Sequence, residues 1–405
     1  MCDPPHMTLR VLLVHNRYSS DTASGENRAV DDDTLALESR GVVVEHFGAT
    51  NDDVKHAGLA TKATAAVNSV WARAAARELG DVIERFKPDV IHVHNVVPLL
   101  SSSVLARSLR ASAPTVWTAH NYRLTCVGGN HTREGRPCTD CAHRARVPGI
   151  VHGCFSGSRP ASATVTIGTT WQRRLVRDAT VIAISDHMRG YLIEHVGVRP
   201  EQVHVRSNGV PDPGPSAGMP SASSDLLLAA RLTPEKGIVL ALDAWTVRRV
   251  TGGRLLVAGA GPLEAELRAR AARDPSIAAL GPLPAEEVRA LALRARAMIA
   301  VPTWEEPFGL TAVEGLAAGR PVIATDRGGL SEIIDASVGR RVECEATAVA
   351  AAMDWVLENG AEADVAGRAG RARWAERYAP EVAVDKLLTI YREAQRRPRP
   401  PHRGS

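Results

Sequence analysis

The first 207 residues alternate short apolar runs with stretches of helical spacing. The apolar runs are β-branched and nearly continuous, which is typical of parallel strands covered on both faces. They lie at 9–15, 42–47, 89–94, 115–120 and 180–185. Helical stretches lie between them, at 25–39 and 69–86. This alternation predicts βαβ units that build a parallel sheet.

The same alternation begins again at residue 225. Apolar runs predict strands at 225–231, 254–261, 297–304 and 321–326. Helical spacing predicts helices at 236–249, 262–273, 285–296, 309–318 and 346–358. Because both halves show the same alternation of strands and helices, the sequence predicts an α/β protein with two doubly wound, Rossmann-like domains that face each other across a cleft. Ligands of such sheets bind at the carboxyl ends of the strands.

Two stretches interrupt the alternation and set the predicted domain boundaries. Residues 122–165 are rich in Gly, Arg, Cys and Pro without a clear period, and they predict an inserted loop. Residues 208–224 are full of Pro, Gly and Ser, which is typical of a hinge. The predicted domains are therefore residues 8–207, with the insertion, and residues 225–378. A last helix is expected at 379–396.

The composition fits a globular protein of two domains. The chain has 405 residues, of which 44% are hydrophobic and 23% are charged, and these fractions are ordinary. No apolar run approaches the ~20 residues that span a bilayer. The first apolar run lacks the layout of a signal peptide and is expected to be the first buried strand. A cytoplasmic location is therefore expected.

The excess positive charge is confined to the end of the chain. The net charge is +4, from 49 basic and 45 acidic residues, and the last 14 residues carry five Arg and one Glu, which is also +4. The rest of the chain is neutral, so no nucleic-acid groove is expected. The tail at 397–405 is expected to be disordered and solvated; contact with an anionic membrane surface at the inner face is the alternative.

Two carboxylates flank a Phe-Gly turn in the stretch EEPFGLTAVEG at 305–315. Glu306 and Glu314 are eight positions apart, and Pro307 and Gly309 predict a helix that begins near 309. The first N–H groups of that helix could take phosphate oxygens. Two acids near a positive helix end favour hydroxyl ligands. Ordinary helix-start carboxylates are the alternative.

Other polar residues also follow predicted strands. Arg231 and Lys236, in ARLTPEKGI, could clamp a diphosphate without metal, or they form a solvated loop pair. Gly25, at the start of a helix, would let backbone N–H groups approach a phosphate, or it belongs to a plain cap. His92 and His94 end a strand, with Asn95 after them. They could face an acceptor, or they are structural.

The three aspartates at 31–33 have the letters of a metal-binding D-x-D motif. They fall inside a helical pattern, where successive residues fan out around the axis. A metal site is therefore not expected, and a solvated helix face is predicted instead.

Four of the six cysteines lie in one window with the spacing C-x11-C-x2-C-x12-C. In a cytosolic chain such clustering indicates a metal more than disulfides. Cys126, Cys138, Cys141 and Cys154 could build a tetrahedral zinc site, with His131, His143 and His152 as substitutes. Four reduced thiols in a small core, or an iron–sulfur centre, are the alternatives.

Taken together, these motifs resemble a retaining glycosyltransferase of family 4 with the GT-B fold. The resemblance rests on the E-x7-E pair, the pair Arg231 and Lys236, the run SNGV at 207–210 and the loop with Gly25 and Glu26, in the expected order. The Cys-rich insertion and the run HNYRLTC are similar to those of bacterial polysaccharide glycosyltransferases. The family's loop is often Gly-Gly-Glu, and here it is SGEN.

The resemblance implies a role for each matching residue. Glu314 would bind the ribose and Glu306 the donor sugar. Arg231 and Lys236 would neutralise the leaving diphosphate, which the loop of Gly25 and Glu26 would approach from the other domain. The turn and helix start would lend backbone N–H groups from Phe308, Gly309, Leu310 and Thr311. The implied catalytic residues are His120, near the reacting sugar, with Glu306, Arg231 and Lys236. The implied acceptor side comprises His92, His94, Asn95 and Asn121. The last helix would cross back to the first domain.

The implied activity is transfer of a hexosyl unit from a nucleotide diphosphate sugar, with a UDP-sugar favoured, to an acceptor hydroxyl with retention. Catalysis would need no cofactor, and zinc would be structural. The expected acceptor is a glycan or lipid-linked precursor of a cell-envelope polysaccharide. A soluble natural-product acceptor, a GT-B-fold UDP-sugar epimerase and a non-catalytic zinc-ribbon docking module are the alternatives. The sequence leaves the donor, the acceptor, the linkage and the oligomeric state open.

Overall fold

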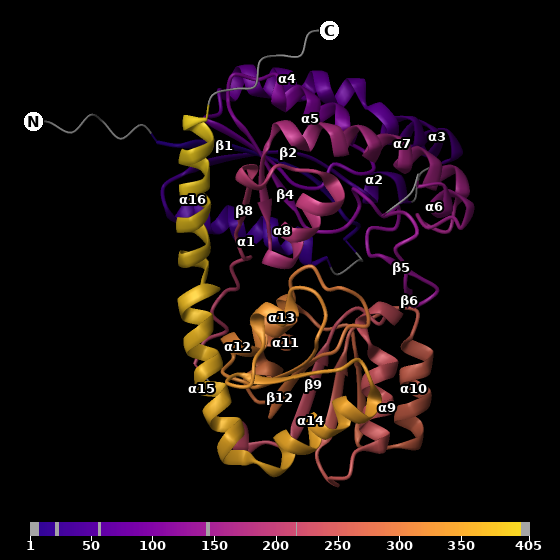
Figure 1. The fold of residues 1–405 in the computed structure, drawn as a ribbon, viewed down its shortest axis with the longest axis vertical. Helices are drawn as coiled ribbons and strands as arrows, with labels where there is room; N and C mark the ends of the chain where they lie inside the picture. The colour runs from indigo at the N-terminus through magenta and orange to yellow at the C-terminus, as the bar shows by residue number, and fades with distance from the viewer. Residues whose placement is uncertain (1–7, 21–23, 56–57, 143–145, 216, 398–405) are drawn as a thin grey trace, which may run out of the picture. The chain divides into compact units, whose positions relative to one another are not determined.

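The computed structural model describes residues 8–20, 24–55, 58–142, 146–215 and 217–397. The chain divides into two compact units. Unit 1 comprises Met1–His131, Cys138–Arg206 and Ala383–Ser405, and unit 2 comprises Thr132–Pro137 and Ser207–Val382. Each unit has its own six-stranded parallel sheet with helices packed on it (Figure 1). Both sheets match the predicted α/β class.

The sheet of unit 1 has the strand order β2-β1-β3-β4-β7-β8. Its strands are β1 Arg10–Arg17, β2 Val43–Thr50, β3 Val90–Val93, β4 Thr115–Ala119, β7 Thr180–Ala183 and β8 Val203–Val205. In register, Val93 of β3 lies opposite Val14 of β1 and Trp117 of β4. The carboxyl ends of these three central strands therefore meet at one edge of the sheet, which is where ligands of such sheets bind.

Helices cover both faces of this sheet. They are α1 Gly25–Ser39, α2 Asp52–Lys55, α3 Leu59–Trp71, α4 Arg73–Phe86, α5 Ser101–Leu109, α6 Val147–Val151, α7 Arg159–Leu175, α8 Asp186–Tyr191 and most of α16 Pro380–Arg396. The helical stretch expected at 69–86 is in fact the end of α3 followed by α4, because the helix breaks at Ala72. Within the described parts of the chain, no helix is both long and apolar enough to cross a membrane.

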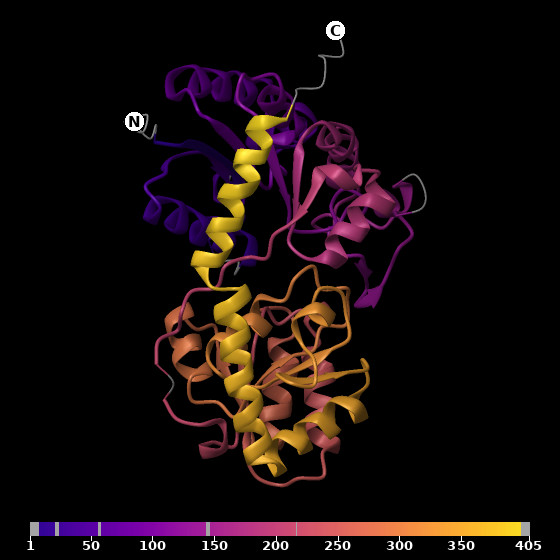
Figure 2. The same ribbon diagram turned by 60° about the vertical axis from the view of Figure 1, so that its left-hand side comes forward.

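Helix α16 belongs to the core of unit 1 from Ala383 onward (Figures 1 and 2). Its buried face comprises Val384, Leu387, Ile390, Tyr391 and Ala394. These side chains pack with Val11, Leu13 and Leu37 from β1 and α1. The last helix of the chain therefore completes the hydrophobic core that the first strand begins.

One aspartate of the triplet at 31–33 corrects the expectation of a solvated face. Asp33 is buried, and both its oxygens accept hydrogen bonds from the Arg206 guanidinium, at 2.7 and 2.5 Å. Arg206 also donates from Nε to the Ala383 carbonyl at 3.1 Å. Asp31 pairs with Arg17 on the exposed side. Because successive residues of a helix point in different directions around its axis, one of the three acids lies in the core.

The sheet of unit 2 has the strand order β11-β10-β9-β12-β13-β14. Its strands are β9 Asp225–Ala229, β10 Arg254–Ala258, β11 Ile277–Gly281, β12 Ala297–Ala300, β13 Val322–Thr325 and β14 Gly339–Val342. Its helices are α9 Ile238–Val247, α10 Glu264–Arg273, α11 Ala285–Ala292, α12 Leu310–Ala317, α13 Leu330–Ile333, α14 Ala346–Glu358 and α15 Gly360–Arg377. In register, Met298 of β12 lies opposite Leu227 of β9, so the loops after these neighbouring strands share one edge.

The start of the predicted linker is fastened within unit 2. The Val210 amide donates to the Tyr378 carbonyl at 2.8 Å, and the Trp374 indole donates to the Val210 carbonyl at 2.9 Å. Val210 itself is buried. The 208–224 segment therefore begins with residues bound to the end of α15 before its Pro- and Gly-rich part.

The insertion is partly structured. It contains a short hairpin, with β5 Thr132–Arg133 and β6 Arg136–Pro137, and the helix α6. The expectation of an irregular loop up to 165 is wrong at its end, because α7 begins at Arg159. Ser158 caps that helix by accepting a hydrogen bond from the Ala161 amide at 3.3 Å, and Pro160 lies in its first turn.

Candidate active site

The loop between β12 and α12 carries the stretch EEPFGL. Helix α12 begins at Leu310 with Gly309 as its N-cap, as predicted. Gly309 has φ of 113°, and a Cβ at this position would lie 2.5 Å from Cδ2 of Leu330. Only glycine fits this turn, for reasons of both backbone and space. The turn places Glu306 before the helix and Glu314 within it, as predicted.

Glu306 is held by two donors from different parts of unit 2. Lys236 Nζ lies 2.7 Å from Oε2 of Glu306, and both side chains are mostly buried. The Trp304 indole N–H donates to the same oxygen at 3.0 Å. The ammonium of Lys236 also lies 5.2 Å from the centroid of the Trp304 ring. These contacts fix the direction of the carboxylate with charge-assisted hydrogen bonds.

Glu305 has separate partners and a different role. Its carboxylate accepts from the Gly328 amide at 2.8 Å and from Arg327 Nη1 at 3.2 Å. The Gly329 amide in turn donates to the Glu306 carbonyl at 2.7 Å. Glu305 therefore fastens its loop to the loop after β13 and positions Glu306.

Arg231 follows β9 and lies at the same sheet edge. Its guanidinium is 3.8 Å from the Glu235 carboxylate, and its side chain is 43% exposed. Lys236 ends the short 3₁₀ turn Pro234–Lys236 in the same loop. The predicted cation pair is thus split: Lys236 neutralises Glu306, and the Arg231 side chain remains accessible to an anionic ligand.

The side chains of Phe308 and Thr311 are engaged within unit 2, so these residues offer a ligand their backbone groups rather than their side chains. Phe308 is buried, with its ring centroid 6.0 Å from that of Tyr378. Thr311 Oγ1 donates to the Ala229 carbonyl at 3.3 Å, which ties α12 to the end of β9. Trp304 was not predicted as a site residue. Its position in the loop between the end of β12 at Ala300 and the two glutamates was the available signal.

A second cluster lies in unit 1, where a pocket is lined by Glu26, His94, His120, Asn121 and Arg123, among others. His94 Nδ1 and His120 Nε2 are 3.0 Å apart, so one of them donates to the other. Burial lowers the pKa of His120 to about 3, with His15 and Arg206 as smaller causes. The His120 imidazole is therefore neutral around pH 7.

Two residues predicted for the acceptor side are engaged inside unit 1. His92 is fully buried, and its ring nitrogens bond to Tyr391 Oη at 2.7 Å and to Thr118 Oγ1 at 2.6 Å. The Asn95 side chain bonds to the Asn16 carbonyl and to both backbone groups of Val97. These contacts favour the structural alternative for His92 and Asn95.

Glu26 lies in the first turn of α1, beside the residues that were predicted to face the acceptor. Its Oε2 accepts from Tyr18 Oη at 3.1 Å and from Asn121 Nδ2 at 3.2 Å. Burial raises the pKa of the Glu26 carboxyl to about 7, and the Arg123 guanidinium opposes this rise. The structure thus joins Glu26, predicted for the donor, with Asn121 and His120. Sequence reasoning missed Tyr18 and Arg123, although Tyr18 directly follows β1.

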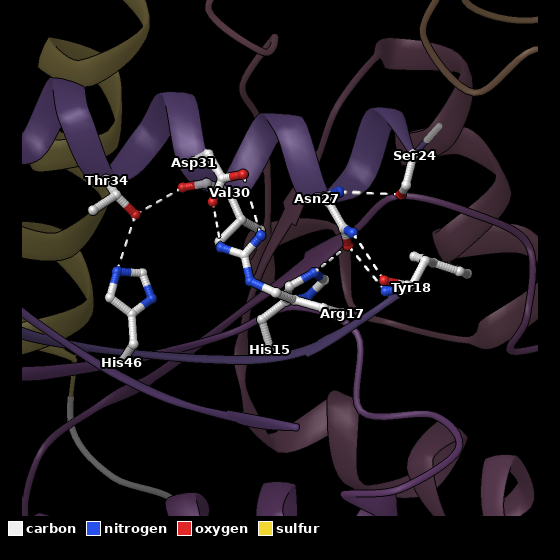
Figure 3. Close-up of polar contacts among 9 residues, drawn as sticks. All are labelled: His15, Arg17, Tyr18, Ser24, Asn27, Val30, Asp31, Thr34 and His46. Atoms are coloured by element: carbon white, nitrogen blue, oxygen red, sulfur yellow. Dashed lines mark hydrogen bonds and ion pairs between the residues drawn. The ribbon is translucent and has the colours of Figure 1, made fainter. Parts of the chain in front are cut away.

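Side-chain hydrogen bonds cap the start of α1 (Figure 3). Ser24 Oγ accepts from the Asn27 amide at 3.2 Å. Asn27 Oδ1 in turn accepts from the Tyr18 amide at 3.1 Å and lies 2.9 Å from His15 Nε2. The serine of SGEN, which departs from the Gly-Gly-Glu pattern, therefore serves as an N-cap next to the exposed Gly25.

The structure gives the predicted zinc site no support. Cys126, Cys138, Cys141 and Cys154 form no disulfide. Burial raises the pKa of the Cys141 thiol, and the nearby Cys126 and Cys138 raise it further. Among the residues described, no group of three or more His, Cys, Asp or Glu side chains is placed to hold a metal ion. His143, predicted as a substitute ligand, lies outside the described residues.

Comparisons with known proteins cover nearly the whole chain. The family model described as glycosyltransferase family 4 matches residues 35–212, and that described as glycosyl transferases group 1 matches residues 216–373. The D-inositol 3-phosphate glycosyltransferase of Segniliparus rotundus is 31% identical over 311 residues, which cover 68% of this chain and 67% of the relative. The glycogen synthase of Mycobacterium tuberculosis is 29% identical over 333 residues, covering 78% and 71%.

Solved structures share the fold over nearly their full length. The sucrose-phosphate synthase of Thermosynechococcus elongatus has a TM-score of 0.72 at 19% identity, covering 95% of this chain and 98% of its own. A glycosyltransferase of Rickettsia africae has a TM-score of 0.69 at 16% identity, covering 96% and 100%. An Anabaena protein solved with UDP and glucose has a TM-score of 0.65 at 17% identity, covering 95% and 100%. At these identities the likeness is one of fold.

Proposed function

Because this chain belongs to the family 4 glycosyltransferases of the GT-B fold, we propose that it transfers a hexosyl unit from a UDP-sugar to an acceptor hydroxyl with retention of configuration. The observation that carries this proposal is the ion pair of Lys236 with Glu306 at a sheet edge of unit 2, where Arg231 and the start of α12, the helix of Glu314, also lie. The Anabaena neighbour, which was solved with UDP and glucose, supports the choice of donor.

The donor half of the reaction needs positive charge where the diphosphate leaves. Arg231 and the first amides of α12 supply it, and Lys236 contributes although it is paired with Glu306. We assign the sugar hydroxyls to Glu306, whose direction Lys236 and Trp304 set. Glu314, more than one turn further along, receives the ribose. A carboxylate that accepts from hydroxyls gives strong, directional hydrogen bonds.

The chemical step that we propose takes place on one face of the sugar. The bond from the anomeric carbon to the leaving phosphate oxygen breaks, and a bond to the acceptor oxygen forms on the same side. The acceptor's hydroxyl proton passes to the departing phosphate oxygen. This route retains the configuration without an enzyme nucleophile, unlike the two-carboxylate scheme of retaining glycosidases.

The pocket of unit 1 is assigned to the sugar acceptor. Neutral His120 can exchange hydrogen bonds with an acceptor hydroxyl without adding positive charge to this pocket. Asn121 and Glu26 add further hydrogen-bonding groups to the same pocket. We favour a glycan or lipid-linked acceptor of a cell-envelope polysaccharide, with a soluble natural product as the second candidate. Zinc has no step in this scheme.

The proposal is tested with a panel of nucleotide sugars. Thermal unfolding of the full chain is measured with UDP-glucose, UDP-N-acetylglucosamine and GDP-mannose, because a ligand that binds only the folded state raises the melting temperature. We expect a UDP-sugar to give the largest rise and to release UDP once an acceptor is added. No rise with any nucleotide sugar would overturn the donor assignment. Conversion of the sugar without acceptor would indicate an epimerase instead.

A further inference from the structure

Three neighbouring helices of unit 1 each expose a pair of apolar side chains one helical turn apart. The pairs are Val67 and Trp71 on α3, Val147 and Val151 on α6, and Ile167 and Trp171 on α7. Residues four apart lie on one face of a helix, so each pair forms a short apolar stripe. We call these six side chains the Trp face.

The three stripes lie on helices that pack together. The Trp71 and Trp171 rings are 6.2 Å apart in an edge-to-face arrangement. Beneath them, a Cβ on Gly168 would lie 2.3 Å from the Ser69 carbonyl oxygen, so α3 and α7 cross in close backbone contact. Helix α6 packs on α7 in the same region of unit 1 (Figure 1).

The clustering is strong for so small a part of the chain. Among the described residues, thirteen large hydrophobic side chains are exposed, and six of them are on these three helices. Single exposed apolar residues are ordinary, whereas a cluster with two tryptophans marks an interaction surface. The exposure of Val67, at 69%, and of Ile167, at 49%, shows that the fold does not need them for its core.

Basic side chains, and no acidic ones, lie on the three helices that carry the Trp face. Within the bounds of α3, α6 and α7 the sequence has no Asp or Glu. Helix α7 carries Arg159, Arg173 and Arg174, and the Arg174 guanidinium lies 5.4 Å from the centroid of the Trp171 ring. Arg73, the first residue of α4, is exposed as well. A surface that combines tryptophan, aliphatic side chains and arginine matches the interface of an anionic bilayer.

We propose that the Trp face docks unit 1 onto the surface of an anionic lipid bilayer. The two tryptophans and the aliphatic side chains enter the headgroup region, while the arginines contact lipid phosphates. A second copy of the chain is a poorer occupant, because a two-fold contact would bring two basic faces together. The docking does not depend on the proposed function, since vesicle binding is measured without any transfer reaction.

The test is flotation of the full-length protein with vesicles. One set contains equal parts of phosphatidylglycerol and phosphatidylcholine, and the other only phosphatidylcholine. We expect binding to the anionic set, weakening as salt rises. Val67→Glu and Ile167→Glu should each weaken that binding about tenfold or more, because each removes apolar contact and adds a negative charge. No binding of the wild type to anionic vesicles overturns the proposal.

Matched variants separate the Trp face from the rest of the protein surface and from the basic tail. Leu35→Glu and Val365→Glu place the same charge at sites of similar exposure, 66% and 57%, outside the Trp face, and should bind as the wild type does. A variant with Arg397, Arg399 and Arg403 changed to serine should keep most of the binding. Equal loss in the matched variants, or loss only in the tail variant, overturns the proposal. A dimer that Ile167→Glu dissociates, without vesicle binding, overturns it in favour of a second copy.

Discussion

At the scale of single residues, the adjacent carboxylates of Glu305 and Glu306 have different partners. Glu305 is committed to Gly328 and Arg327, whereas Glu306 is oriented by Lys236 and Trp304. We therefore expect Glu306→Ala to lower kcat/KM for UDP-sugar transfer by about two orders of magnitude or more. The far-UV circular dichroism should remain that of the wild type. Glu287→Ala, an exposed site on α11, serves as the control. Transfer by Glu306→Ala at the wild-type rate would contradict the assignment.

The raised pKa of Glu26 makes stability depend on pH in a defined direction. Below about pH 4.5 the carboxyl is protonated in both the folded and the unfolded state, so it has no effect. Between that pH and about 7 it ionises only in the unfolded state, and the wild type therefore loses stability as pH rises. Above about 7 the loss is complete and constant.

Glu26→Gln removes this titration. The free energy of unfolding of the variant, relative to the wild type, should rise from pH 5 to pH 8 by up to about 3 kcal/mol. Urea unfolding of both proteins at pH 5, 6, 7 and 8 measures this difference in the free energy of unfolding. The contribution of the buried histidines to the pH dependence cancels, because both proteins contain them. A difference that does not change with pH would show that Glu26 is not held in its protonated form.

At the scale of elements, the start of α12 depends on Gly309. Gly309→Ala should lower the free energy of unfolding by about 2 kcal/mol, from backbone strain and from contact with Leu330. It should also weaken UDP-sugar binding several-fold, because the first amides of the helix shift. Gly252→Ala is the matched control: its φ of 93° imposes similar strain, and an added Cβ meets nothing within 4 Å. Calorimetric affinities that are equal in the two variants would contradict a role for this turn in binding.

Local signals decided which elements could be predicted from the sequence. The helices at 25–39 and 346–358 were predicted with their observed bounds, because their periodicity is clear. Helix α15, GAEADVAGRAGRARWAER, was missed, since its small and charged residues give no apolar stripe. Its buried side consists of Ala363, Ala366, Gly367, Gly370 and Trp374. There, close packing against α12 replaces hydrophobic periodicity as the cause of the helix.

In the candidate site too, only the features that local signals decide could be predicted from the sequence. The placement of Glu306 before α12 and of Glu314 within it follows from Pro307 and Gly309, which are local. The contact of Lys236 with Glu306 joins residues 70 positions apart, and that of His92 with Tyr391 joins residues 299 apart. No local pattern encodes such pairs. The sequence alone therefore left open whether His92 faces a ligand or the core.

At the scale of the whole molecule, the last helix of the chain stabilises the first unit. Leu387 on α16 is fully buried among the side chains of β1 and α1, and Tyr391 completes the hydrogen bonds of His92. The fold of unit 1 thus needs residues from both ends of the sequence. This connection makes a test of stability possible that leaves the candidate site untouched.

Leu387→Ala should lower the free energy of unfolding of unit 1 by about 2–5 kcal/mol, since it leaves a cavity in the core. Its neighbour Lys386 is exposed, so Lys386→Ala should change the stability by less than about 0.5 kcal/mol. Thermal unfolding of both variants, followed by near-UV circular dichroism, measures the difference. UDP-sugar affinity at low temperature should stay near that of the wild type in both, because the donor residues lie in unit 2. Equal stability of the two variants would show that α16 is not part of the core of unit 1.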